Sequence, residues 1–203
     1  MKYDAEKREI ISDKILNNLD KLALSFVKIL EKHVEYVIIS GYVSILLGRT
    51  RTTEDIDIFI KKISFEKFSK LYDDLEREGF WCINAEKAEE IYSYLRGGLA
   101  VRFARKNEAV PNFEVKFPKR EIDEEAFNDF IIVNLKGEKL KISSLERQIA
   151  FKKYYLGTDK DIEDAQHVEQ IFKEKIDYNK INKFRGIIEG IKENERRKNI
   201  QKG

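Results

Sequence analysis

The sequence predicts a single α/β (α+β) fold, a mixed β-sheet flanked by helices, with a helical part at its C-terminal end. As far as residue 142, short β-branched segments such as residues 36–40 alternate with segments of helical periodicity. From residue 143 onward, the apolar residues recur only at helical spacing. No Gly/Ser-rich linker interrupts the 203 residues. We therefore expect residues 1–142 to form an α/β core with N-terminal helices, and residues 143–203 to pack on it as helices.

The N-terminal elements are predicted from the spacing of apolar residues and from the residues that start or end helices and strands. Residues 1–30 are expected to be helical, because Ile10, Ile11, Ile15 and Leu16 recur at helical spacing. The β-branched run YVIIS predicts a buried strand that stops at Gly41. The next segments are expected to be a short helix ending at residue 48, a strand over residues 55–60, a helix capped by Ser64 and running to residue 78, and a strand over residues 80–83.

The remaining elements follow the same two periods. A helix over residues 85–96 is stopped by two glycines, and strand-like segments follow at residues 99–105 and 112–117. Residues 130–135 and 139–143 are expected to pair as a hairpin. Three helices complete the chain: residues 143–157 after a Ser143/Glu146 capping box, residues 158–172, and a last helix from residue 177 that becomes a frayed charged tail.

Composition limits the classes of function. The 39 basic and 37 acidic residues leave a net charge of +2, which lacks the basic excess of most strong nucleic-acid binders. The single cysteine, Cys82, excludes an intrachain disulfide framework. The N-terminus lacks the apolar run of a signal peptide, and no stretch is long and apolar enough to span a bilayer. We expect a cytoplasmic protein without membrane contact, and the abundance of Lys and Glu favours a thermophilic source.

Two carboxylates carry the chemical signal. Asp55 and Asp57 alternate with isoleucines, so they project from the same face of their predicted strand. Two adjacent anions repel each other, and a divalent cation such as Mg²⁺ removes that cost while binding phosphate oxygens. Gly41 permits close approach of the backbone to a ligand at the preceding turn. The alternative is a solvated edge strand with no ligand.

These residues resemble a known family. Ile39-Ser40-Gly41-Tyr42, followed at a fitting separation by Asp55-Ile56-Asp57-Ile58, is similar to the signature of the DNA polymerase β-like nucleotidyltransferase superfamily. The segment between them, Gly48-Arg49-Thr50-Arg51-Thr52-Thr53-Glu54, resembles the small prokaryotic branch that includes AbiEii-type toxins. Tyr42 departs from the small residue that is usual at its position. The resemblance covers about two thirds of the chain and implies a nucleotidyltransferase-like fold.

The resemblance also implies a catalytic site. Asp55 and Asp57 would bind two Mg²⁺ ions, or Mn²⁺ in their place, and Glu114 in the run NFEVKF would complete one metal site and help deprotonate the attacking hydroxyl. The reaction implied is transfer of a nucleotide (NMP) from an NTP such as ATP to an acceptor hydroxyl. The residues expected to bind the nucleotide are Ser40, Gly41, Tyr42, Arg51 and Lys153.

The later part of this resemblance lies in IAFKKYYLGTDKDIEDA. Lys153 matches a helix lysine that would steady the triphosphate, although the adjacent Lys152 can take that role. Lys160-Asp161 and Asp164 match the following acidic positions, but Leu156-Gly157 stands where the family often has an arginine. Helix capping or ion pairing is the favoured interpretation of the two aspartates, whereas Arg49 and Arg51 can equally contact phosphate or be surface charges.

Several alternatives remain open at this stage. The implied partners are the NTP, an acceptor on RNA or protein, and an antitoxin protein if the chain is the toxin of a toxin–antitoxin pair. A non-catalytic nucleotide-binding or partner-binding module that retains the fold is the competing hypothesis. The C-terminal helices can also serve dimerisation or antitoxin docking. His33 and His167 are isolated and are expected to be ordinary helix residues, and Cys82 is expected to pack in the core.

Overall fold

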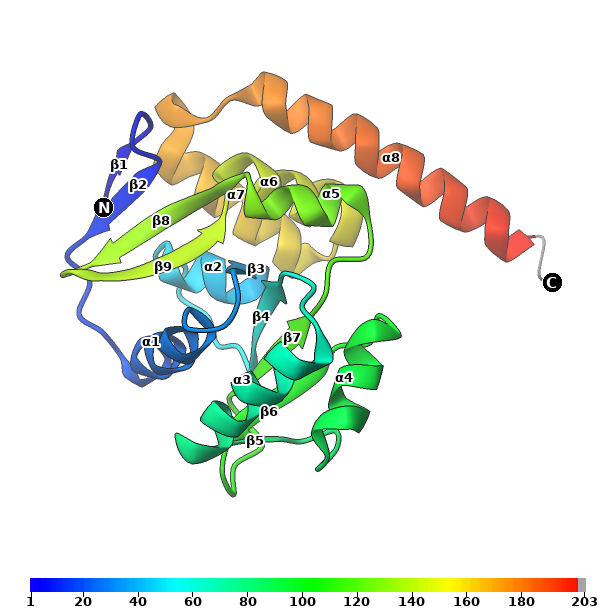
Figure 1. The fold of residues 1–203 in the computed structure, drawn as a ribbon. Helices are drawn as coiled ribbons and strands as arrows, with labels where there is room; N and C mark the ends of the chain where they lie inside the picture. Colours follow the sequence, from blue (N-terminus) through cyan, green and yellow to red (C-terminus); the bar gives the residue numbers. More distant parts are fainter. Residues whose placement is uncertain (201–203) are drawn as a thin grey trace.

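The computed structural model describes residues 1–200, and within them nine strands form one mixed sheet (Figure 1). The strand order across the sheet is β1-β2-β8-β9-β3-β4-β7-β6-β5. The strands are β1 (Lys2–Asp4), β2 (Glu9–Ser12), β3 (Tyr36–Ile39), β4 (Asp55–Ile60), β5 (Phe80–Cys82), β6 (Val101–Arg105), β7 (Asn112–Lys116), β8 (Phe130–Leu135) and β9 (Glu138–Ser143).

Helices pack around the sheet in two groups. The first group contains α1 (Asn18–Leu30), α3 (Phe65–Arg77) and α4 (Ala88–Arg96), which lie together in the lower half of Figure 1. The second group lies above it and contains the C-terminal helices. These and the remaining helical segments are α2 (Gly41–Leu46), α5 (Glu121–Glu124), η1 (Glu125–Phe127), α6 (Leu145–Ala150), the π-helix η2 (Phe151–Leu156), α7 (Asp159–Phe172), η3 (Lys173–Lys175) and α8 (Tyr178–Ile200).

Strand β4 lies inside the sheet, between β3 and β7. It pairs antiparallel with β3 and parallel with β7. Ile56, Ile58 and Ile60 are fully buried on one face, while the alternate residues on the other face are only partly buried. The period of two therefore directs both aspartates of this strand to the same face.

One hydrophobic cluster joins the sheet to both groups of helices. Phe26 of α1 stacks on Phe113 of β7, with ring centroids 3.9 Å apart. From the C-terminal helices, Ile149, Val168 and Ile188 belong to the same cluster and are completely buried. Because these residues share a core with the sheet, the helices after residue 143 are part of the folded body.

The predicted α/β class is confirmed, but the prediction of helix over residues 1–30 is wrong for the first seventeen. β1 and β2 form a hairpin there, and β2 pairs parallel with β8, with Ile10 opposite Val133. Ile10 is fully buried whereas Ile11 is 52% exposed, as expected of alternating strand residues. The helix begins only after Asn17, whose side chain accepts from the Asp20 backbone N–H in a capping box.

The predicted hairpin of residues 130–143 is confirmed as β8 and β9. The C-terminal tail differs from its prediction, because α8 continues as helix to Ile200 instead of fraying. Exposed i,i+4 pairs, Arg185 with Glu189 and Arg197 with Glu193, support this helix. The end of the predicted tail, residues 201–203, lies outside the described residues. None of the helices described combines the length and the apolar character needed to cross a membrane.

Candidate active site

Three carboxylates lie on two neighbouring strands. Asp55 and Asp57 share the partly exposed face of β4. The parallel register with β7 places Glu114 directly opposite Asp57. Burial raises the pKa of Asp57, and the neighbouring charges of Glu114 and Asp55 raise it further, against the opposing effect of Lys116. The structure thus pairs Asp57 with Glu114, while Asp55 lies two residues away along β4, opposite Asn112. Of the three acidic residues that the sequence analysis singled out, only Asp57 lines the cavity described below.

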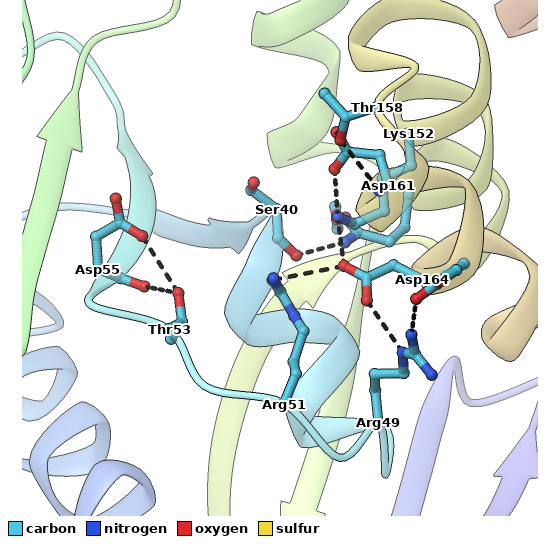
Figure 2. Close-up of polar contacts among 12 residues, drawn as sticks. Ser40, Arg49, Arg51, Thr53, Asp55, Lys152, Thr158, Asp161 and Asp164 are labelled. Carbon is cyan, nitrogen blue, oxygen red and sulfur yellow. Dashed lines mark hydrogen bonds and ion pairs between the residues drawn. The ribbon is translucent and has the colours of Figure 1, made fainter.

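A lysine ammonium lies among these acids. Lys116 Nζ donates to Asp57 Oδ1 at 2.9 Å and to Glu114 Oε1 at 3.4 Å. Arg102 on the adjacent strand β6 donates to the other oxygen of Glu114 at 3.2 Å. Asp55 instead accepts from the hydroxyl of Thr53 at 3.2 Å (Figure 2). Lys116 lies two residues after Glu114 on the same face of β7, and its side chain also reaches across to Asp57 of β4.

The donor set has the chemistry of a divalent-cation site. Within residues 1–200, no three or more His, Cys, Asp or Glu side chains are gathered closely enough to hold a metal ion. Carboxylate oxygens are nevertheless the ligands that Mg²⁺ prefers. Burial disfavours the anionic form of Asp57, and a nearby positive charge favours it. In this structure that charge is the Lys116 ammonium.

The turn between β3 and α2 lies beside these carboxylates. Ile39, the last residue of β3, pairs with Asp57, and Ser40 follows it. Ser40 adopts φ 63° and ψ −134°, a conformation that residues with a side chain rarely occupy. Gly41 is in close contact with the Arg51 guanidinium, which would have to move to make room for a Cβ at this position.

Tyr42 does not contribute a side chain to this turn. It is completely buried, and its hydroxyl donates to Asp20 Oδ1 at 3.0 Å. Burial, with the adjacent Asp20 charge, raises the pKa of this hydroxyl. The large residue found where the family signature has a small one therefore lies in the core, away from the space in front of the turn.

A buried group of charges lies behind the turn (Figure 2). Lys152 is 2% exposed, and its ammonium donates to Asp164 at 2.8 Å and to Asp161 at 3.0 Å. Arg51 approaches the same Asp164 carboxylate at 3.4 Å, and Arg49 Nε lies 3.5 Å from its second oxygen. Asp164 is fully buried, so its charge depends on these cations.

Lys153 and Lys152 are separated by their position on the helix. Lys153 pairs with Glu169 of α7 and does not line the cavity described below. Lys152 does line it, and it is also tied to Asp161 and Asp164. Successive residues on a helix point in different directions, and here Lys152 points into the cavity whereas Lys153 points toward α7. The geometry therefore favours Lys152 over Lys153, the residue that the resemblance matched best.

A cavity of about 520 Å³ opens between the ends of β3, β4 and β7 and the C-terminal helices. This volume lies in the range of small-molecule sites. Asp57 and Lys116 lie at its sheet side, and Phe151 and Tyr155 supply aromatic rings from the π-helix η2. Its lining consists of Ile39, Ser40, Asp57, Phe59, Lys116, Phe117, Lys119, Arg120, Asp123, Ser143, Arg147, Gln148, Phe151, Lys152, Tyr155, Leu156 and Glu195.

The chain matches, over residues 18–202, the protein family described as "Nucleotidyl transferase of unknown function (DUF2204)". It belongs to this nucleotidyl transferase family. No curated protein matches the sequence. The match covers both the strands that carry the acidic residues and the helices that close the cavity. It does not single out the AbiEii-type branch, which therefore stays a prediction.

Solved nucleotidyltransferase structures share the fold of this nucleotidyl transferase. ANT(2″)-Ia in complex with adenylyl-2″-tobramycin is 15% identical, with a TM-score of 0.55 over 86% of this chain and 98% of that one. The solution structure of the antibiotic-resistance factor ANT(2″)-Ia gives 14% identity and a TM-score of 0.52 over 90% and 99% of the chains. An antigenic nucleotidyltransferase-like protein from Paracoccidioides brasiliensis is 18% identical. Its TM-score is 0.51, and the match covers 74% of this chain and 75% of that one. At these identities the likeness shows the fold alone.

The two histidines and the cysteine of this nucleotidyl transferase make ordinary structural contacts. His33 pairs with Asp74, and His167 lies against the backbone carbonyl of Leu47. Cys82 is buried in β5. Sequence reasoning missed Gln148 and Arg120, both of which line the cavity. Gln148 lies within α6 and Arg120 precedes α5, and neither belongs to a motif that one sequence would reveal.

Proposed function

We propose that this protein is a metal-dependent nucleotidyltransferase that moves an NMP group from an NTP to an acceptor hydroxyl. The observation that carries the proposal is the register of β4 and β7, which sets Glu114 beside Asp57 next to the Ser40–Gly41 turn. Membership of a nucleotidyl transferase family supports it. In this proposal Asp55, Asp57 and Glu114 hold Mg²⁺, or Mn²⁺ in its place.

The reaction divides among named groups. The acceptor oxygen forms a bond to the α-phosphorus while the bond from that phosphorus to the bridging oxygen of pyrophosphate breaks, and Glu114 helps to take the hydroxyl proton. Divalent cations in such a site neutralise phosphate charge and stabilise both the entering and the leaving oxygens. The backbone of Ser40 and Gly41 is proposed to face the phosphates, and Lys152 supplies the nearby positive charge.

Lys116 takes a separate role in this proposal. Without substrate its ammonium partly neutralises Asp57 and Glu114, which lie 2.9 and 3.4 Å away. If Asp57 held a divalent cation, that cation would take over the neutralising role of the Lys116 ammonium, and Lys116 would be free to contact phosphate. The aromatic rings of Phe151 and Tyr155, farther along the cavity, can stack against the base.

Binding measurements test the proposal directly. Isothermal titration with each NTP, in Mg²⁺ and then in EDTA, is expected to show Mg-dependent binding to the native protein. The Asp55→Asn/Asp57→Asn variant is expected to lose both this binding and nucleotide transfer. The matched control is Asp13→Asn/Asp73→Asn, which removes two exposed carboxylates outside the site and leaves binding unchanged. Full activity in the Asp55/Asp57 variant would contradict the mechanism.

The non-catalytic alternative rests on the Lys116 ion pairs, which already satisfy the acidic residues without a metal. Mg-NTP binding without turnover across many acceptors would favour it. The acceptor itself is a further proposal: RNA or protein follows from the AbiEii resemblance, as do the toxin role and an antitoxin partner. A cytoplasmic location is a separate proposal that rests on composition. The ANT(2″)-Ia complex holds adenylyl-2″-tobramycin, so a small-molecule acceptor belongs among those tested.

A further inference from the structure

Ser40 needs an external restraint. Its φ of 63° and ψ of −134° lie in a region that only glycine occupies readily. Its side chain makes no capping hydrogen bond to α2, so it does not stabilise its own backbone conformation. The contacts that hold this turn must therefore come from other segments of the chain.

Gln148 supplies such a contact from α6. Its side-chain Nε2 donates to the backbone carbonyl of Ser40. The hydroxyl of Ser143, at the end of β9, donates to the Oε1 of the same amide at 3.0 Å. Gln148 and Ser143 are 3% and 2% exposed, so water does not compete strongly for these bonds. Because Ser143 donates to the amide oxygen, the amide NH₂ group is directed at Ser40.

The turn is held from a second side by Arg51. Its guanidinium lies against Gly41 at a distance that leaves no room for a Cβ. Arg51 is anchored in turn by the buried Asp164 carboxylate, 3.4 Å away. The carbonyl of Ser40 and the Cα of Gly41 are thus restrained by groups from different parts of the chain.

We propose that Gln148, oriented by Ser143, is a positioning residue that holds the Ser40–Gly41 turn in the conformation that receives the phosphates of the nucleotide. This inference rests on the proposed function, because it assigns the turn to phosphate. Gln148 acts through the backbone of Ser40. Its amide lines the cavity together with Ser40 and Lys152, so the helical region shapes the binding face of the sheet.

The test compares four variants with the native protein. Gln148→Met keeps the length of the side chain but removes the donor, and Ser143→Ala removes the group that orients the amide. Ser40→Gly combined with Gln148→Met gives the turn a residue that adopts this backbone without strain. Gln166→Met, on an exposed position of α7, is the matched control. Backbone amide exchange at residues 41 and 42 is measured first, followed by KM and kcat for the Mg-NTP.

Gln148→Met is expected to speed amide exchange at the turn and to raise KM on the order of tenfold, the loss of about one buried hydrogen bond, with a smaller change in kcat. Ser143→Ala is expected to act in the same direction, Ser40→Gly to restore part of the loss, and Gln166→Met to change neither measurement. Unchanged exchange and KM in both Gln148→Met and Ser143→Ala would overturn the inference. A native protein that binds no NTP would refute the proposed function alone, because the exchange measurement tests the restraint independently. If Gln148→Met does not fold, Ser143→Ala decides.

Discussion

The charged residues near the site differ mainly in how deeply their side chains are buried. Lys152 and Asp164 are almost completely buried, whereas the side chains of Lys153 and Glu169 keep 24% and 21% of their surface exposed. A buried pair costs much to break because the remaining charge is left without solvent, but a partly exposed pair contributes little. Two neighbouring lysines that form similar pairs therefore contribute very differently to stability.

Replacing each lysine by methionine measures this difference. Lys152→Met is expected to lower the free energy of unfolding by about 3 kcal/mol, near the low end for a broken buried pair, because Arg51 still faces Asp164. Lys153→Met is expected to cost roughly 1 kcal/mol or less. Urea denaturation of the two variants gives both values. Equal losses would contradict the assignment of Lys152 to the buried network.

Part of the candidate site could be predicted from local patterns in the sequence. Alternation along one strand was enough to place Asp55 and Asp57 on one face, since a period of two is a local property. The position of Glu114 beside Asp57 depends on strand register, which only the resemblance to a family suggested. The choice between Lys152 and Lys153 depends on which side of η2 faces the sheet. Gln148 acts through a tertiary contact and leaves no local signal.

Among the secondary-structure elements, Asp129 joins three parts of the fold. Its carboxylate accepts from Arg8 of the N-terminal hairpin at 2.7 Å, from Ser144 at the start of α6, and from Lys180 of α8. Burial alone would raise the pKa of Asp129. The hydrogen bonds from Lys180, Ser144 and Arg8, together with the charge of Lys180, outweigh burial and hold the pKa below its ordinary value.

This pKa predicts a dependence of stability on pH. As pH falls, the unfolded chain takes up the proton first, at its ordinary value of about 3.9, so the stabilisation is complete above that pH. It is then lost as the pH falls through the lower pKa of the folded state. Asp129→Asn is expected to cost about 1.5–3 kcal/mol at neutral pH, and the difference from the native protein should shrink below about pH 4. Thermal unfolding across this range, with Asp73→Asn as the control for an exposed carboxylate, measures it.

The N-terminal hairpin shows why local periodicity fails for some elements. The spacing of Ile10, Ile11, Ile15 and Leu16 fits a helix, yet residues 9–12 form a strand because they pair with β8. That partner lies more than a hundred residues away, and tertiary pairing overrides a weak local preference. The hairpin of β8 and β9 was predictable because its partners are adjacent in sequence.

In the whole molecule, the C-terminal helices belong to the same hydrophobic cluster as the sheet, and the division at residue 142 stays a prediction. A chain that ends at residue 142 would lack Ile149, Val168 and Ile188, all completely buried, and would expose the sheet surface they cover. We expect this chain to lose cooperative unfolding. A chain that ends at residue 192 loses residues 193–198, which are exposed, and should keep its melting temperature within about 4 °C. Calorimetry of both chains tests this, and a cooperative transition in the shorter one would show that the helices are an appendage.

The order of the strands in the sheet also determines the order in which a newly made chain can assemble. A ribosome releases β1, β2 and β3 first, but their neighbours β8 and β9 are among the last strands to emerge. Strands β4 to β7 pair among themselves and can close while synthesis continues, so Asp57 and Glu114 come together early. Gln148 and Lys152 follow only after β9 is complete. A nascent chain can therefore pair its acidic residues before it has a cavity, because the cavity also needs the helical residues that follow β9.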